Sequence, residues 1–221
     1  VLGVGYSLHL PWLSLWKTMN EASPRQREIL FSCDALQVIA VTQLVVILLQ
    51  WVVGRRWTLA AAAMALAVIA AAPGVWAADV ARHLPEPLAP YLDNSSGSRF
   101  PVFPYAAFVL AGTLAGASLG RAEPRARHRR ALGAGLGILA LGTGRALALA
   151  GWVDDWGPSP AYVFVRLGGL LLLLLLVEGA ARGRVPGIRP LALLGHETLL
   201  VYVLHLYLLY GGIVIGPSPV G

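Results

Sequence analysis

The apolar residues of this chain come in blocks of about 20, the length of α-helix that crosses a hydrocarbon layer about 30 Å thick. Hydrophobic residues make up 57% of the sequence and charged residues only 13%, whereas soluble globular proteins carry roughly 25% charged residues. In hydrocarbon, every backbone amide must be satisfied within a helix or a closed barrel. Because apolar runs such as Leu170–Leu176 are continuous rather than alternating, the sequence predicts an all-α, polytopic transmembrane helical bundle.

Seven apolar blocks define the expected architecture of six full spans and one partial N-terminal span. The blocks run roughly over Val1–Leu15, Cys33–Val53, Trp57–Trp76, Pro104–Gly120, Ala131–Trp152, Tyr162–Ala181 and Leu191–Ile215. We expect residues 1–221 to form a single transmembrane domain. The chain starts at Val1 inside an apolar stretch, with no basic segment before it. We therefore expect the domain to be truncated at its N-terminus, and also at its C-terminus.

The basic residues indicate how the bundle is oriented. Every second connection between blocks is rich in arginine, and these connections hold Arg55, Arg56, Arg121, Arg125, Arg127, Arg129, Arg130, Arg182, Arg184 and Arg189. The intervening connections mix few basic residues with acidic ones such as Asp93, Asp154 and Asp155. By the positive-inside rule, the arginine-rich connections are cytoplasmic and the C-terminus faces outward, in a multi-pass protein of the inner membrane. The net charge of +6 is thereby explained without nucleic acid as a partner.

The numbers and spacings of cysteine and histidine residues limit which disulfides and metal sites the chain can form. Cys33 is the only cysteine, which excludes an internal disulfide and a multi-cysteine metal site. No two histidines or carboxylates stand at the spacing of paired metal ligands, so we predict no metal.

Ionisable residues inside the apolar blocks mark the candidate site, because a buried charge costs several kcal/mol and usually faces the interior of a bundle. Asp34 and Gln37 share a face at the outer start of the second block. Arg145 lies about two turns from the outer end of its helix, and Arg166 about one turn inside the next. His205 lies near the middle of the last block. We expect these groups to converge on one polar cavity in the outward half. The alternative is a structural Arg–Asp pair with snorkelling arginines, and for His205 a hydrogen bond between helices.

Two further features concern packing and the outer surface. Gly112, Gly116 and Gly120 repeat every four residues, the spacing of a helix-packing stripe. The longest connection, Ala77–Phe103, is rich in proline and in turn-forming residues. Loops of this length are often lids or binding loops, and a solvated hairpin without a role is equally compatible with the sequence.

Three stretches resemble one family. They are "DALQVIAVTQLVVILLQ" at 34–50, "SRFPVFPYAAFVLAGTLAG" at 98–116 and "LLGHETLLVYVLHLYLLYG" at 193–211. These stretches resemble the catalytic domain of heparan-α-glucosaminide N-acetyltransferase and its bacterial transmembrane relatives. The resemblance covers most of the chain, and its most specific positions are Leu36–Gln37 and Tyr202–His205.

The resemblance implies an integral-membrane acyltransferase that moves an acetyl group from cytoplasmic acetyl-CoA to the amine or hydroxyl of an extracytoplasmic sugar. On this hypothesis His205 takes the proton of the acceptor, Asp34 orients a basic group, and the acceptor is bound by Gln37, Arg99, Arg145 and Arg166. The family's early helices carry an arginine-containing motif and a histidine regarded as catalytic, and they would precede this chain. His9, in "GYSLHLP", is not identified with that histidine.

Two other classes of function stay open on the sequence. The same embedded charges would suit a transporter or flippase for a sugar or a lipid-linked solute, although no internal repeat is found. A purely structural bundle would instead pair its embedded charges with each other. The acceptor, the length of the acyl donor and the formation of a homo-oligomer are not determined by the sequence.

Overall fold

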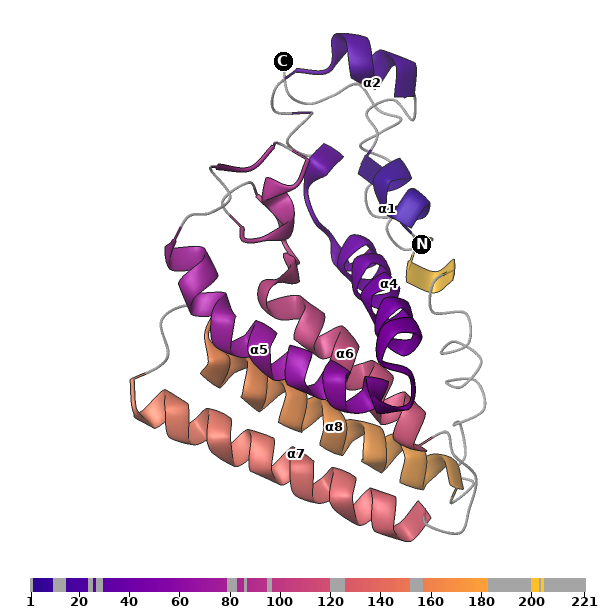
Figure 1. The fold of residues 1–221 in the computed structure, drawn as a ribbon, viewed down its shortest axis with the longest axis vertical. Helices are drawn as coiled ribbons and strands as arrows, with labels where there is room; N and C mark the ends of the chain where they lie inside the picture. The colour runs from indigo at the N-terminus through magenta and orange to yellow at the C-terminus, as the bar shows by residue number, and fades with distance from the viewer. Residues whose placement is uncertain are drawn as a thin grey trace. The chain divides into compact units, whose positions relative to one another are not determined.

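The computed structural model describes residues 2–9, 15–23, 26, 30–78, 83–85, 87–94, 97–119, 126–151, 157–182, 200–202 and 204 (Figure 1). Within these ranges every regular element is helical, which confirms the all-α prediction. By its internal contacts the chain divides into two units, Val1–Leu175 and Leu176–Gly221. The elements below belong to the first unit, except for the last part of the final long helix.

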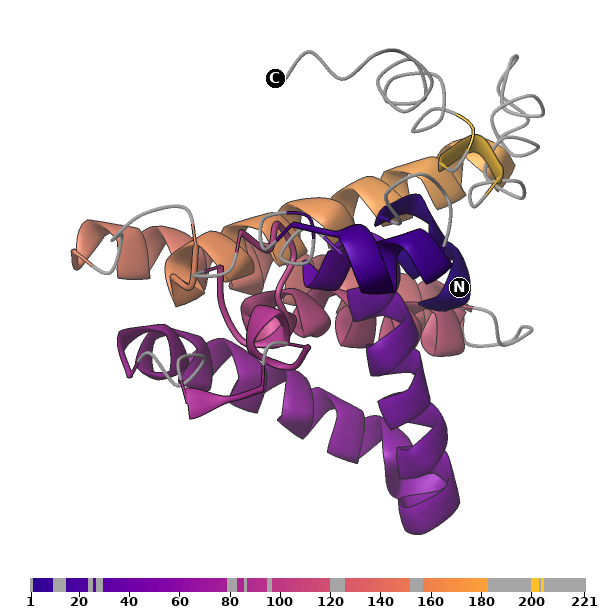
Figure 2. The same ribbon diagram turned by 90° about the horizontal axis from the view of Figure 1, so that it is seen from above.

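The long helices α4, α5, α6, α7 and α8 lie where apolar blocks predicted them, whereas α1 covers only part of the first block and α2 lies in the expected connection after it. Their bounds are α1 Leu2–His9, α2 Leu15–Glu21, α4 Ala35–Val53, α5 Trp57–Ala77, α6 Val102–Leu119, α7 Ala126–Leu149 and α8 Pro160–Arg182, with short 3-10 turns η2 at Gly54–Arg56 and η4 at Ala89–Tyr91. The chain changes direction between α4 and α5 at Gly54, whose φ of +58° is a conformation that glycine adopts without strain (Figures 1 and 2). The expected last span, 191–215, falls almost entirely outside the described residues.

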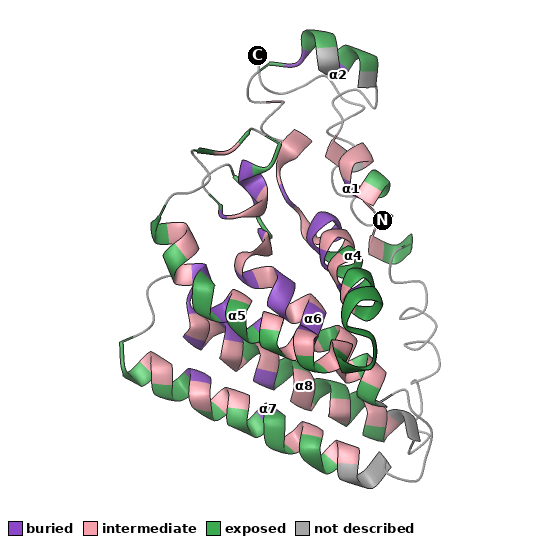
Figure 3. Cartoon of the chain, viewed as in Figure 1, coloured by how far each residue is buried: buried purple, intermediate pink, exposed green. Residues whose placement is uncertain are grey.

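Three stretches of the described chain are long and apolar enough to cross a membrane. They are Ala35–Ala77, which contains α4 and α5, then Arg129–Leu149 and Pro160–Ala180, and a shorter apolar helix covers Val102–Ser118. Many of their outward-facing side chains are large and apolar, such as Leu48 and Leu139, which are 58% and 64% exposed (Figure 3). Such a surface suits contact with acyl chains. The chain is therefore a membrane protein, and the count of six spans stays a prediction.

Small residues let the central helices pack closely. Ala61 and Ala65 lie one turn apart on α5 and are buried, and together with Ile69 they pack with Ala107 and Leu110 of α6. Val46 of α4 and Val163 of α8 complete the same core cluster. The buried positions of Figure 3 gather accordingly on the facing sides of these helices.

Glycines bring the backbones of α7 and α8 close together. A Cβ atom placed on Gly144 would lie 2.7 Å from the backbone oxygen of Ala161 and 2.7 Å from the backbone nitrogen of Val165. A Cβ atom on Gly168 would lie 2.6 Å from the backbone oxygen of Gly137. Since the contacts pair later residues of α7 with earlier residues of α8, the two helices run antiparallel. Only glycine permits this separation between the backbones.

The predicted packing stripe at 112, 116 and 120 is wrong for its two described members. Gly112 and Gly116 are exposed, and a Cβ atom on either would meet no atom within 4 Å. Gly120 lies outside the described residues. Glycines at helical spacing permit close packing, but whether a neighbour uses them depends on which helix face meets another helix.

Several segments come together at one end of the first unit. The indole nitrogen of Trp76, at the end of α5, donates a hydrogen bond to the backbone oxygen of Phe103 at the start of α6 (2.9 Å). The Trp76 ring also packs against Gly157, just before α8. The backbone N–H of Phe100 donates to the backbone oxygen of Cys33, just before α4 (3.1 Å). The starts of α4, α6 and α8 therefore lie at the end that contains Asp34.

Candidate functional site

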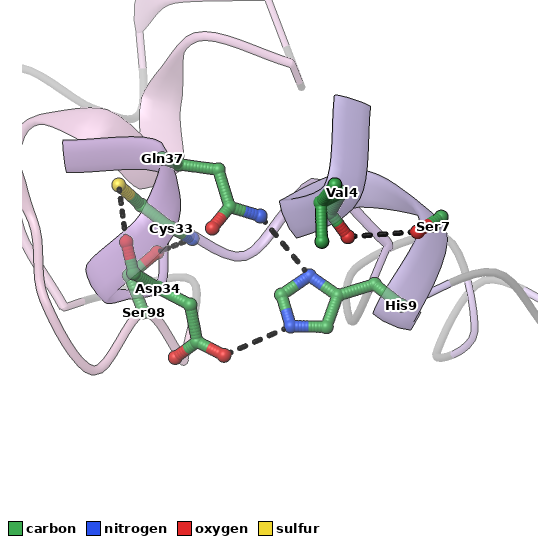
Figure 4. A network of polar contacts seen from close by, with 7 residues as sticks. All are labelled: Val4, Ser7, His9, Cys33, Asp34, Gln37 and Ser98. Atoms are coloured by element: carbon green, nitrogen blue, oxygen red, sulfur yellow. Dashed lines mark hydrogen bonds and ion pairs between the residues drawn. The ribbon is translucent and has the colours of Figure 1, made fainter. Parts of the chain in front are cut away.

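The site begins at the residue that precedes α4. Asp34 has an extended backbone and occupies the N-cap position, where an aspartate commonly bonds the first free N–H groups of a helix. Its carboxylate makes no such capping bond. Instead, the carboxylate oxygen Oδ2 lies 3.0 Å from the ring nitrogen Nε2 of His9 (Figure 4). The Asp34 side chain thus contacts α1 instead of capping its own helix, α4.

His9 is the last residue of α1, and both of its ring nitrogens have a partner. Nε2 contacts Asp34, and Nδ1 lies 3.4 Å from the amide nitrogen of Gln37. The neutral tautomer that carries its hydrogen on Nε2 satisfies both contacts, because Nε2–H then donates to the carboxylate and Nδ1 accepts from the amide. The side chains of His9 and Asp34 are 14% and 27% exposed, so the pair is largely shielded.

Gln37 lies one turn along α4 and is completely buried. Figure 4 shows its amide nitrogen directed toward His9 and its carbonyl oxygen directed away from the ring. Among the described residues, that oxygen is buried without a hydrogen-bond partner. Gly5 of α1 makes room for the amide, since a Cβ atom there would lie 3.0 Å from the Gln37 carbonyl oxygen. A buried acceptor without a donor costs about 1–3 kcal/mol, which favours a role in binding a donor group.

The long connection between α5 and α6 is tied to this site. The Ser98 hydroxyl accepts a hydrogen bond from the backbone N–H of Cys33 (2.9 Å), and Ser98 is itself buried. The hydroxyl of Tyr91, in η4, lies 2.6 Å from the hydroxyl of Tyr6, one turn before His9 on α1. The described part of the connection is therefore tied to α1 and to the start of α4, and whether it acts as a binding loop stays a prediction.

The stability of the site should fall at alkaline pH because of Cys33. Burial, with a smaller contribution from the Asp34 carboxylate, raises the pKa of the Cys33 thiol from 9.0 to about 12. Between these values the unfolded chain loses the thiol proton while the folded chain keeps it, so the free energy of unfolding decreases as pH rises. Three pKa units correspond to at most about 4 kcal/mol. Burial and the hydrogen bond with the Tyr6 hydroxyl also raise the pKa of Tyr91. The free energy of unfolding therefore decreases further at high pH, where the unfolded chain loses the phenol proton first.

Thermal unfolding of the protein in detergent at pH 7, 9 and 10.5 tests this prediction. We expect the midpoint to fall most steeply above pH 9. Cys33→Ala should remove much of the slope, while Ser7→Ala, which removes no ionisable group, should leave it unchanged. An identical slope in Cys33→Ala and in the unmodified protein would show that the thiol does not govern the loss.

The structure thus brings together Asp34 and Gln37 of the predicted site residues. Arg145 is exposed on α7, and Arg166 is exposed on α8 with its guanidinium carbon 4.1 Å from the centre of the Tyr162 ring. Arg99 is exposed in the connection beside Ser98. His205 lies outside the described residues. The roles assigned to these four residues stay predictions.

Sequence reasoning missed His9, which the structure places at the centre of the site. Its position inside an apolar block is the same signal that singled out His205. Its partner, however, is 25 residues away along the chain, and no local pattern reveals such a contact. Within the described ranges, no three His, Cys, Asp or Glu side chains form a group that could hold a metal ion.

The described chain is thus a membrane protein with helices long enough to cross a bilayer. At one end of these helices a histidine, a carboxylate and a buried amide are in contact. The sequence matches the family model described as "Heparan-alpha-glucosaminide N-acetyltransferase, catalytic" over residues 19–149, more than half of the chain. The protein therefore belongs to this family of membrane acetyltransferases. The matched range includes Asp34, Gln37 and Arg145, while His9 and Arg166 lie outside it. No curated protein and no solved structure gives a significant match to the chain.

Proposed function

We propose that the protein is an integral-membrane acyltransferase that moves an acetyl group from cytoplasmic acetyl-CoA to the amine or hydroxyl of an extracytoplasmic sugar. The observation that carries this proposal is the contact between His9 and Asp34 beside the buried amide of Gln37, in a chain of an acetyltransferase family. Acyl transfer to an amine or hydroxyl requires a group that removes the acceptor's proton, and a histidine suits this step at neutral pH.

Each of the three side chains has a role in this proposal. Asp34 accepts the hydrogen of Nε2 and so leaves the lone pair of Nδ1 as the basic atom of His9, the same logic by which a carboxylate orients a catalytic histidine in hydrolases. The contact from Gln37 to Nδ1 is long, at 3.4 Å, so an acceptor N–H or O–H can replace it. The unpaired oxygen of Gln37 is then available to a second donor group of the same acceptor.

The bonds of the reaction balance within this arrangement. His9 takes the proton as the acceptor nitrogen or oxygen forms a bond to the acetyl carbonyl carbon. The bond from that carbon to the sulfur of coenzyme A breaks, and the thiolate leaves with the electron pair and is protonated on release. The chain's part is to bind the acceptor, to orient it and to accept its proton. On the sequence-based assignment His205 would take this proton instead, so the two histidines are alternatives to be tested.

The opposite end of α4 offers groups that fit the phosphates of coenzyme A. Arg55 and Arg56 are exposed in η2, directly after α4. At 1.5 Å per residue, the 19 residues of α4 separate these arginines from Asp34 by about 28 Å, close to the thickness of a hydrocarbon layer. Together with the positive-inside rule, this separation supports a cytoplasmic donor and an acceptor on the other side.

Proteoliposomes test the proposed reaction directly. With labelled acetyl-CoA outside the vesicle, on the side of Arg55, and glucosamine on the other, we expect the label to appear on the amino sugar. Label transfer to no amine or hydroxyl acceptor would contradict the proposal. Accumulation of unmodified sugar without acetyl-CoA would identify a transporter instead.

A further inference from the structure

Two tyrosines join α1 to the turn η4. The hydroxyl oxygens of Tyr6, on α1, and Tyr91, in η4, lie 2.6 Å apart, a short hydrogen-bond distance for two hydroxyl groups. The two residues are 85 positions apart along the chain. The contact therefore fixes α1 to an element that is not its neighbour in the sequence.

Tyr91 is itself well anchored. Its ring packs against a core cluster that includes Cys33 and Ala106. The two residues before it in η4, Ala89 and Pro90, are buried. Because the ring and the preceding turn are held by packing, the Tyr91 hydroxyl is a fixed point against which α1 can be positioned.

The same connection also holds the residue next to Asp34. The Ser98 hydroxyl accepts a hydrogen bond from the backbone N–H of Cys33, and the N–H of Phe100 donates to the backbone oxygen of Cys33 (2.9 and 3.1 Å). Figure 4 shows Ser98 beside Cys33 and Asp34. Described parts of one connection therefore contact both the helix that carries His9 and the backbone beside its carboxylate partner.

Tyr6 and His9 lie on the same face of α1. They are three residues apart, which places their side chains about 60° apart around the helix axis. Gly5 packs against Gln37 without a side chain, so its contact does little to fix the rotation of α1 about its axis. The side chains of Tyr6 and His9 fix that rotation through their hydrogen bonds to other elements. Loss of the bond at Tyr6 would let α1 turn and carry the imidazole away from Asp34.

We propose that Tyr91 is a positioning residue for His9 and acts through its hydrogen bond to Tyr6. The bond sets the rotation of α1, which keeps the imidazole 3.0 Å from the Asp34 carboxylate and within reach of Gln37. A misplacement of about 1 Å in a catalytic site can cost about 100-fold in rate. The importance of Tyr91 for catalysis rests on the proposed function of His9, whereas the orientation of the His9 ring can be measured without any reaction.

The test follows the tautomer of His9 by nitrogen-15 NMR of histidine-labelled protein in detergent at pH 8, where an ordinary imidazole is neutral. The sequence has five histidines, and His9→Ala identifies the signals of His9. We expect mainly the tautomer with its hydrogen on Nε2 in the unmodified protein. In Tyr91→Phe and in Tyr6→Phe, the ratio of this tautomer to the other should fall roughly two- to tenfold, the worth of one hydrogen bond. In acetyl transfer, kcat should fall by a similar factor while KM for the acceptor changes little.

Two further variants make the test specific. In the double variant Tyr6→Phe/Tyr91→Phe, the change should equal that of either single variant, because both substitutions remove the same hydrogen bond. Tyr105→Phe is the matched control. Its ring packs against the same core cluster as that of Tyr91, but its hydroxyl interacts with Tyr162 of α8, so the His9 signals should stay unchanged.

Three results would overturn the inference. The first is an unchanged His9 tautomer ratio in both single variants, and if one of them does not fold, the other decides alone. The second is a double variant whose change is the product of the two single changes, which would show that the hydroxyls act independently. The third is an equal change in Tyr105→Phe, which would show a general loosening of the core. If the signals respond as expected but the unmodified protein transfers no acetyl group, the proposed function fails and the positioning of His9 by Tyr91 stands.

Discussion

Replacing His9 with alanine should lower acetyl transfer by about 100-fold or more. The imidazole is held by Asp34 at 3.0 Å and presents Nδ1 beside Gln37, so its loss removes the base and leaves the two binding groups in place. General-base catalysis by a positioned side chain contributes roughly 10²–10⁴-fold, which sets the expected size of the effect. Because the base acts on the reacting proton, kcat should fall while the KM for the acceptor changes little. Initial rates of label transfer in proteoliposomes measure both constants.

Controls separate the loss of the base from damage to α1. Ser7→Ala changes a residue of the same helix whose hydroxyl donates a hydrogen bond within that helix, to the backbone oxygen of Val4 (2.8 Å), and should keep full activity. Asp34→Asn should lower kcat by a smaller factor than His9→Ala, because the ring stays but its tautomer is no longer fixed. The comparison with His205→Ala decides between the two histidines. Full activity in His9→Ala together with its loss in His205→Ala would show that the proton goes to His205.

Replacing Gly144 with alanine should destabilise the protein by about 2–3 kcal/mol, the upper part of the range for overpacked contacts. The new methyl group would lie 2.7 Å from the backbone atoms Ala161 O and Val165 N, so α7 and α8 would have to separate. Backbone atoms cannot move aside as the end of a flexible side chain can. The unfolding midpoint in detergent, followed by intrinsic tryptophan fluorescence, measures the effect.

Gly142→Ala is the matched control for this prediction. Gly142 lies two residues earlier on α7, is exposed, and a Cβ atom there would meet no atom within 4 Å. Alanine favours the helix over glycine by about 1 kcal/mol, so this variant should be unchanged or more stable.

A double variant tests whether the backbone of α8 causes the clash. Gly144→Ala/Val165→Gly removes the Val165 side chain from the contact and leaves the backbone atoms of α8 in place. Recovery of stability in the double variant would therefore contradict a contact between backbones.

The course of the helices was largely predictable from the sequence. The expected block at 57–76 is helix 57–77, and the block at 162–181 is helix 160–182. These bounds depend on local properties, namely the length of an apolar run and the need to satisfy every backbone amide within it. The shared face of Asp34 and Gln37 followed in the same way from helical spacing, and the structure directs both side chains toward His9.

The partner of those two residues was not predictable, and neither were the glycines that pack. His9 and Asp34 meet because α1 packs against the start of α4, and the sequence between them does not encode that packing in any local pattern. Gly116 and Gly144 carry similar local signals, yet one faces open space and the other faces a helix backbone.

The sequence by itself determined that the chain is a helical membrane protein, where most of its helices run, and which charges are too costly to lie in lipid without compensation. Only the tertiary structure decided which of these groups meet. Burial in hydrocarbon and backbone hydrogen bonding act on each segment separately, whereas a contact between side chains depends on the faces that two helices turn toward each other. For that reason the histidine beside Asp34 and the glycine contacts between α7 and α8 became apparent only when the helices were placed together.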